Sequence, residues 1–184
     1  TFYTNGMATM SIPAQMNAIG VVAAFLHLIV HSVVKIMAFF CAGSVLHYAH
    51  REYVSELEGL GRRMPLTFAC FTVAACALTG IPPFNGFVSK WYIGLAAVSG
   101  GSVASYLGFI AILISALLTA IYMFQVVVKA WFPTEGTVLP TKESAHEAGA
   151  FMIVPMLILA ALCLLMGLFP EVLLDVIGKA VIHP

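Results

Sequence analysis

The stretch that decides the fold is residues 64–98, which read MPLTFACFTVAACALTGIPPFNGFVSKWYIGLAAV. It is apolar almost throughout, but a cluster of glycines and prolines interrupts it near the middle. The interrupting residues are Gly80, Pro82, Pro83 and Gly86. No regular helix continues through such a cluster, because proline lacks the backbone N–H and clashes with the preceding turn. We therefore predict two half-helices joined by a break at 80–86, which a bilayer tolerates only where protein or water surrounds it.

The composition of the whole chain is that of an integral membrane protein. Of its 184 residues, 61% are hydrophobic and 9% are charged, whereas a soluble domain carries about 25% charged residues. The formal net charge is zero, which gives no electrostatic basis for binding nucleic acid. The four cysteines lie in apolar runs without the spacing of a zinc site, as expected of buried hydrophobic side chains. They are Cys41, Cys70, Cys76 and Cys163.

The apolar runs predict an all-α transmembrane bundle of about four spans, one of them discontinuous, in a single domain over residues 1–184. The predicted spans are approximately 18–46, 64–98 with its break, 103–128 and 149–169. Residues 170–182 have apolar positions at helical spacing but are too short to cross, so we predict an interfacial helix along the membrane surface.

The distribution of basic residues favours one crossing, not two, for residues 64–98. With one crossing, the loops 47–63 and 129–148 lie on the same side and hold nearly all the positive charge. Those basic residues are Arg51, Arg62, Arg63, Lys129 and Lys142, and the other side holds Lys179. Because positive charge collects in cytoplasmic loops, we predict that the arginine side is cytoplasmic.

The beginning of the chain does not resemble a targeting signal. It starts at Thr1 and has no basic region ahead of an apolar core, so we do not expect a secretory signal peptide. Residues 1–11 read as a loop between helices, which predicts that the sequence is a piece of a longer polypeptide.

Four titratable residues lie in apolar surroundings. His27, His31 and Lys35 are spaced i, i+4 and i+8, so on a helix they share one face and each step rises about 6 Å. Lys90 follows the predicted break by about one turn. A lysine at the middle of a bilayer costs about 2.5–3.5 kcal/mol on insertion scales, and burial disfavours its charged form. Two lysines, two histidines and a hydrated break are the parts of a proton pathway.

Structural interpretations of the same residues remain open. A histidine in a membrane helix can serve only as an interhelical hydrogen-bond partner, and Lys90 could be an interfacial anchor beside two aromatic residues. His47 and His50 are spaced like a metal pair but have no third ligand in the pattern, so we expect no metal site. Asn85 and Ser89 could line water at the break or simply cap the second half-helix.

The two segments HLIVHSVVKIMAFFCAGSV, residues 27–45, and LEGLGRRMPLTFACFTVAACALTGIPPFNGFVSKW, from residue 57, together resemble a known family. They are similar to the antiporter-type proton-conducting subunits of respiratory complex I (NADH–quinone oxidoreductase), Mrp sodium/proton antiporters and membrane-bound energy-converting hydrogenases. The paired signature, HxxxHxxxK followed by GxPPxxGFxSK, carries the resemblance. It covers about residues 20–98.

The resemblance implies a fold and a set of site residues. Family members have about fourteen transmembrane helices with two inverted repeats, so the spans here would be the last four. Lys35 and Lys90 match the family's buried lysines, and His27 and His31 match its relay histidines. The implied function is proton translocation in a redox-driven ion pump or a multisubunit antiporter. The chain itself would perform no bond chemistry and hold no cofactor, while partner subunits could carry iron–sulfur clusters, flavin or nickel.

One departure from the family concerns the first of its two repeats. Family members also have a Glu–Lys pair in the first repeat, but no carboxylate lies in a predicted span here, so that half would be on another polypeptide or missing from this one. Expected partners are other membrane subunits, protons with sodium as an alternative ion, and the lipid bilayer. The SKWY ending favours the Mrp and hydrogenase branches, and hence a bacterial or archaeal cytoplasmic membrane over the mitochondrial one. A purely structural membrane subunit is the alternative function.

Overall fold

The computed structural model describes residues 12–134 and 145–182, and within these ranges all regular structure is helical. This confirms the predicted all-α fold. In chain order the elements are α2 (Ile12–Ala49), η1 (Val54–Glu56), η2 (Leu60–Arg62), α3 (Pro65–Thr79), α4 (Asn85–Gly100), α5 (Val103–Trp131), α6 (Ala150–Leu168) and α7 (Pro170–Ile182). The predicted opening loop, residues 1–11, and Lys142 lie outside the described residues.

In the part of the chain that the structure describes, three helices are long and apolar enough to cross a membrane, and a shorter apolar helix accompanies them. The three are Ala18–Ala49, Val103–Trp131 and Ala150–Leu168, and the shorter one is Pro65–Thr79. Several observed helices extend past the predicted spans, because α2 runs from Ile12 to Ala49, α4 continues to Gly100 and α5 continues to Trp131. An apolar run marks only the part of a helix suited to hydrocarbon, and the helix itself continues into polar residues beyond it.

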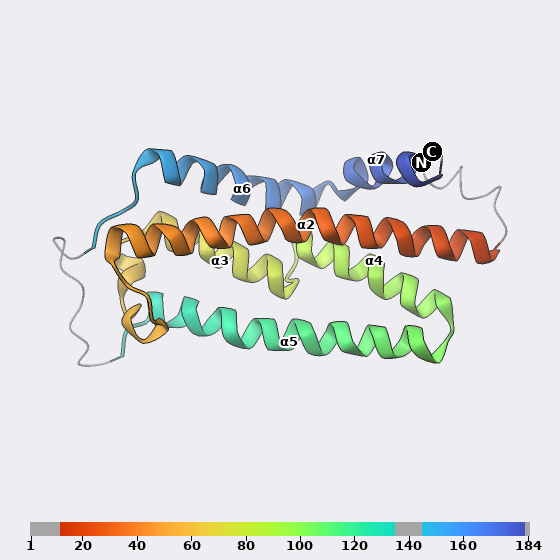
Figure 1. The fold of residues 1–184 in the computed structure, drawn as a ribbon, viewed down its shortest axis with the longest axis horizontal. Coiled ribbons are helices and arrows are strands. Elements are labelled where there is room, and N and C mark those ends of the chain that lie inside the picture. Colours follow the sequence, from red (N-terminus) through yellow and green to blue (C-terminus); the bar gives the residue numbers. More distant parts are fainter. Residues whose placement is uncertain (1–11, 135–144, 183–184) are drawn as a thin grey trace.

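The predicted broken helix is present as α3 and α4. Pro65 occupies the first turn of α3, where its missing N–H would have no helical partner anyway. The helix ends because Gly80 adopts a φ of 92°, and the N–H groups of Gly80 and Ile81 both donate to Cys76 O at 3.0 Å. α4 then begins at Asn85, so the break is shorter than the predicted 80–86. Figure 1 shows α3 and α4 following each other in one direction along α2, so this stretch traverses the bundle once.

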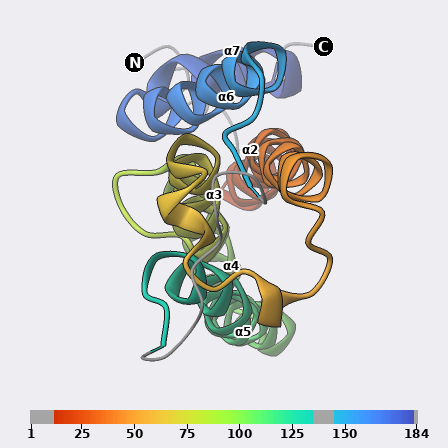
Figure 2. The ribbon, with the colours of Figure 1, turned by 90° about the vertical axis from the view of Figure 1, so that its left-hand side faces the viewer.

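The helices pack in layers when they are viewed end-on (Figure 2). α5 lies on one side, α2 and the α3–α4 pair lie in the middle, and α6 with α7 lies on the other side. Sulfur atoms line part of the contact between α2 and α6. Cys41 Sγ lies 3.5 Å from Met156 Sδ, and Ser44 Oγ lies 3.9 Å from the sulfur atoms of Met152 and Met156.

α6 and α7 form a second interrupted helix. They run in the same direction along α2 and are separated at Phe169 (Figure 1). α7 packs on the first half of α2 through Leu174 and Ile177, which contact the buried residues Val22, Leu26 and Val30. The interfacial position predicted for residues 170–182 depends on where a bilayer lies, and it stays a prediction.

The loops between helices place the predicted basic side at one end of the bundle. The loop after α2 meets the end of α5, where Gly59 N donates to Lys129 O at 3.1 Å. A buried apolar cluster that includes Leu60, Met64 and Ala130 closes this end. Arg51, Arg62, Arg63 and Lys129 are therefore at the same end, as one crossing of residues 64–98 requires (Figure 1). That this end of the bundle faces the cytoplasm stays a prediction.

Candidate functional site

Lys90 binds the end of the half-helix that precedes the break. Its Nζ donates to Leu78 O at 2.6 Å and to Thr79 O at 2.9 Å. These carbonyls belong to the last turn of α3, where an α-helix leaves its carbonyls without helical partners. The C-terminal end of a helix also carries partial negative charge, so it attracts a cation. The break therefore creates an acceptor site, and the lysine one turn into α4 fills it.

Gly80 is required at this site for two reasons. Its φ of 92° lies in the left-handed region, which favours glycine because other residues place a Cβ against the backbone there. A Cβ at Gly80 would also lie 3.0 Å from Cδ and 3.5 Å from Nζ of Lys90. The glycine thus ends α3 and leaves room for the lysine side chain.

His27 reaches the same broken helix from α2. Its Nδ1 lies 3.1 Å from Ser89 Oγ, and that hydroxyl donates to Gly86 O at 3.2 Å. Ser89 is completely buried, and His27 is half-buried. The structure therefore brings His27 and Lys90, two of the predicted site residues, to the first turns of α4.

The other two predicted site residues are further along α2. The rings of His27 and His31 have centroids 5.6 Å apart, which agrees with their positions on neighbouring turns of one helix. His31 is exposed and Lys35 is partly exposed. Within the described ranges Lys35 makes no hydrogen bond or ion pair. The structure thus places His31 beside His27 but gives Lys35 no polar partner there.

Three buried polar atoms flank the break without a hydrogen-bond partner among the described residues. They are Thr79 Oγ1 and both side-chain polar atoms of Asn85. Asn85 is completely buried at the start of α4. Buried polar groups in proteins are nearly always paired, and internal water supplies the partner where protein does not. The polar surroundings of the break are therefore suited to hold water.

A carboxylate that the sequence analysis did not single out caps the other end of α3. Glu147 accepts hydrogen bonds from Leu66 N at 2.8 Å, Thr67 N at 3.4 Å and Thr67 Oγ1 at 2.6 Å. A carboxylate is stabilising at a helix N-terminus, where the unpaired N–H groups carry partial positive charge. The available signal was an acidic residue just ahead of a long apolar run. Its partner, 80 residues earlier, could not be identified from the sequence.

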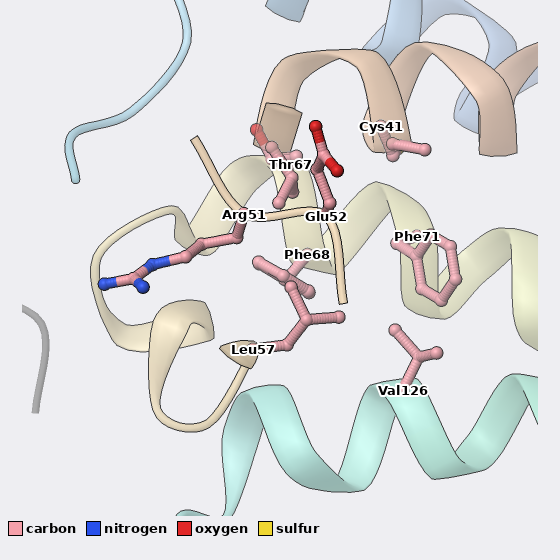
Figure 3. A pocket seen from close by; sticks show the side chains of 10 residues that line it. Cys41, Arg51, Glu52, Leu57, Thr67, Phe68, Phe71 and Val126 are labelled. Carbon is pink, nitrogen blue, oxygen red and sulfur yellow. The ribbon is translucent and has the colours of Figure 1, made fainter. Parts of the chain in front are cut away.

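A pocket of about 170 Å³ lies near the capped end of α3 (Figure 3). Its walls are mostly apolar, with polar groups on the loop side. The lining residues are Cys41, Ala42, Val45, Arg51, Glu52, Leu57, Thr67, Phe68, Phe71 and Val126. In the view of Figure 3, the side chain of Arg51 points away from Phe71 and Val126. None of the four predicted site residues lines this pocket, so it is separate from the break.

The remaining titratable groups of the described residues form no comparable site. In residues 12–134 and 145–182, no three or more His, Cys, Asp or Glu side chains converge as metal ligands would. The four cysteines are free thiols. An exposed ion pair joins Lys179 Nζ to Asp175 Oδ2 at 2.7 Å within α7.

Comparison with known proteins identifies relatives of the chain. Residues 4–119 match the family model described as NADH:quinone oxidoreductase/Mrp antiporter, TM. The NADH-quinone oxidoreductase subunit N of Desulforudis audaxviator is 36% identical over 165 residues, covering 84% of this chain and 32% of the relative. The Na(+)/H(+) antiporter subunit A1 of Staphylococcus haemolyticus is 33% identical over 168 residues, covering 87% of this chain and 21% of the relative.

A solved structure has the same fold. A chain of the Mrp complex from a Dietzia species matches with a TM-score of 0.77 and 23% identity, over 91% of this chain and 39% of that chain. The chain described here thus spans about a third or less of the length of the curated relatives reported above.

Proposed function

This chain belongs to the NADH:quinone oxidoreductase/Mrp antiporter family of membrane subunits, and from that membership we propose that it translocates protons by charging and discharging Lys90, Lys35, His27 and His31. It is an antiporter-like integral membrane subunit, and its relatives are subunits of multisubunit complexes. The route, the ion and the driving reaction are parts of the proposal.

The observation that supports the proposal most directly is the contact of Lys90 with the α3 carbonyls. The ammonium donates to Leu78 O and Thr79 O, and the negative end of the α3 dipole stabilises its charge. A neutral amine loses most of this electrostatic attraction. Its flexible four-carbon stem then lets the nitrogen leave the carbonyls. Protonation and position of Lys90 are therefore coupled, as a gate for protons requires.

The histidines extend the proposed route along α2. His27 contacts the first turn of α4 through Ser89, and His31 lies one turn away. Lys35 lies a further turn along α2. In this proposal, water molecules bridge the remaining distances between these side chains. The unpaired atoms of Thr79 and Asn85 support hydration at the break. In this proposal Lys35 is the central exchange site and Lys90 controls exit toward one surface.

The proposed partners follow from the need for an energy source. The chain would work beside other membrane subunits, including one that carries the first antiporter repeat. In a redox pump, partner subunits would hold iron–sulfur clusters, flavin or nickel. In an Mrp-type assembly, an existing gradient of protons or sodium would supply the energy. Mass spectrometry of the subunits that co-purify with the native complex separates these two assemblies.

The test is to replace each lysine by methionine in the full complex and to measure assembly and transport separately. Lys35→Met and Lys90→Met remove the charge but retain an unbranched side chain of similar length. Native gels measure assembly, and a pH-sensitive dye in proteoliposomes measures proton flux. Lys179→Met is the matched control, because Lys179 lies in an exposed ion pair on α7. We expect normal assembly for all three variants, with flux reduced about a hundredfold or more in the first two.

A structural role is the second candidate, and the contact between His27 and Ser89 favours it. That hydrogen bond joins α2 to α4, as interhelical hydrogen bonds do in membrane proteins. If the polar residues only join helices, Lys35→Met and Lys90→Met will assemble with unchanged flux. That result would refute proton translocation by these residues.

A further inference from the structure

The hydroxyl of Ser89 contacts two groups, one from each of two helices. Its Oγ lies 3.1 Å from Nδ1 of His27 on α2 and 3.2 Å from the carbonyl oxygen of Gly86 on α4. Ser89 itself has no exposed surface. The two contacts therefore determine where its single proton lies.

The chemistry of the three groups allows one assignment that satisfies both contacts. A carbonyl oxygen can only accept, so the Ser89 hydroxyl must donate its one proton to Gly86 O. Ser89 Oγ then has only lone pairs to offer to His27. Nδ1 of His27 must therefore carry a proton and donate it to Ser89 Oγ. In a neutral imidazole only one nitrogen is protonated, so Nε2 is the basic nitrogen.

We infer that Ser89 is a positioning residue that holds neutral His27 in its Nδ1–H tautomer. Nε2 is consequently the atom at which His27 takes up and releases a proton. When Nε2 gains a proton, the imidazolium still donates from Nδ1 to Ser89, and when Nε2 loses it, the neutral ring returns to the same state. The inference rests on the proposed proton relay and names the atom through which that relay passes at His27.

The position of Gly86 links this tautomer to the break. A Cβ added at Gly86 would overlap the carbonyl oxygen of Ala77, so the start of α4 is packed directly against the end of α3. The Gly86 carbonyl that orients the Ser89 hydroxyl is thereby held in place by the half-helix whose last carbonyls bind Lys90. Because Gly86 and Ser89 both lie in α4, a shift of α4 relative to α2 would separate the Ser89 hydroxyl from Nδ1 and release the tautomer of His27.

The test measures the tautomer directly by solid-state NMR of the full complex in lipid, with 15N-labelled histidine. The resonances of His27 are assigned by their loss in His27→Gln. At a pH where His27 is neutral, we expect a protonated Nδ1 and an unprotonated Nε2. In Ser89→Ala the Nε2–H tautomer should appear, and proton flux should fall about fivefold, which is the loss expected for one neutral hydrogen bond. Ser89→Thr retains the hydroxyl and should retain the Nδ1–H tautomer.

A matched serine provides the control. Ser32 on α2 donates to the carbonyl of Leu28 at 2.8 Å, the same type of backbone contact, but it has no histidine partner in the part of the chain that the structure describes. Ser32→Ala should leave both the spectrum of His27 and the flux unchanged. A wild-type spectrum with Nε2 protonated, or an unchanged spectrum in Ser89→Ala, overturns the tautomer assignment.

Failure of the inference about Ser89 can be distinguished from failure of the proposed function. Unchanged flux in Lys35→Met and Lys90→Met refutes the proton relay whatever the tautomer of His27. Loss of flux in those variants, together with an altered tautomer and unchanged flux in Ser89→Ala, overturns the role of Ser89 and leaves the lysines in place.

Discussion

The described residues contain two interrupted helices, and among these residues only the first has charged side chains bound at both ends of its leading half. α3 has Glu147 at its N-terminus and Lys90 at its C-terminus. α6 is also followed by a break, but no side chain of the described residues caps either of its ends, where the capping positions are Gly149 and Phe169. The two breaks therefore differ in what satisfies their backbone groups.

The difference follows from how each helix is interrupted. Between α3 and α4 the chain passes through several residues, which leaves the last carbonyls of α3 to accept from a lysine. Between α6 and α7 one residue, Phe169, intervenes before Pro170, and Phe169 N still donates to Leu165 O at 2.8 Å. Proline contributes no N–H of its own. Both breaks therefore leave carbonyls free at the end of the leading half, and the first becomes a site for charge because its longer connection brings Lys90 back to them. Four predictions test this comparison.

The largest effect is expected for Gly86→Val, which alters the contact between the halves of the first interrupted helix. The new side chain would overlap backbone atoms of Ala77, and backbone cannot move aside as a flexible side chain can. We expect destabilisation above the usual 1–3 kcal/mol of overpacking, seen as loss of folded protein by size-exclusion chromatography in detergent. Gly108→Ala is the control, because nothing lies within 4 Å of a Cβ there. Normal yield of Gly86→Val would show that the halves are not held in contact.

The next largest effect is expected for the carboxylate cap of α3. Glu147→Ala removes the acceptor of four donors, and Thr67→Val removes one of those donors with little change in shape. A double-mutant cycle should give a coupling energy of about 1.5–3 kcal/mol, as for hydrogen bonds to a charged group, measured by chemical or thermal unfolding. Glu171→Ala, in the first turn of α7, should cost no more than about 1 kcal/mol. Equal losses for the two glutamates would remove the distinction between the interrupted helices.

A smaller effect is expected where the two interrupted helices meet. A Cβ at Gly167 near the end of α6 would overlap Pro83 O and lie 2.7 Å from Asn85 N. Because only one methyl group is added, we expect Gly167→Ala to cost about 1–2 kcal/mol, in the lower part of the usual range for overpacking. The rate of proton flux should also fall, since the displaced residues lie just before α4 and at its first position. Reduced stability with unchanged flux would show that α6 supports the break without influencing Lys90.

The smallest effect is expected for Pro170→Ala at the second break. Proline at the first position of a helix replaces an N–H that has no helical partner, so its removal should change the free energy of unfolding by no more than about 0.5 kcal/mol. Flux should be unchanged. Thermal unfolding and dye-based transport measurements check both points. A large loss of flux would show that the second break is also functional.

The sequence predicted the number of helices that traverse the bundle and the place of the first break, because both depend on local features. An apolar run and a cluster of Gly and Pro determine them directly. The face of α2 that carries His27 and His31 also follows from helical spacing. What could not be predicted are contacts between segments that are distant in sequence. Glu147 caps α3 only because the loop before α6 returns to residue 67, and no local pattern indicates that.

The contacts of Lys90 could not be predicted either, although their partners lie only 12 and 11 residues earlier in the sequence. Its place one turn beyond the break was evident, but a lysine beside Trp91 could equally have anchored at an interface. Trp91 is 57% exposed and stacks with Phe87. Lys90, which directly precedes it in the chain, instead donates to α3. The rotation of α4 about its axis separates these two environments. It is set by the packing of Gly86 and Gly94, the latter against Phe109, rather than by the hydropathy of the segment.

The sulfur atoms between α2 and α6 make the contact between these two helices adaptable. Met156 is completely buried there against Cys41 and Ser44. An unbranched thioether can change rotamer to follow a neighbour, which a β-branched side chain cannot do as easily. α6 can therefore accommodate small displacements of the loop at Pro83 while it keeps its contact with α2. Oxidation of Met156 to the sulfoxide would place a polar group in this buried contact, so the packing of α6 on α2 depends on a reduced thioether.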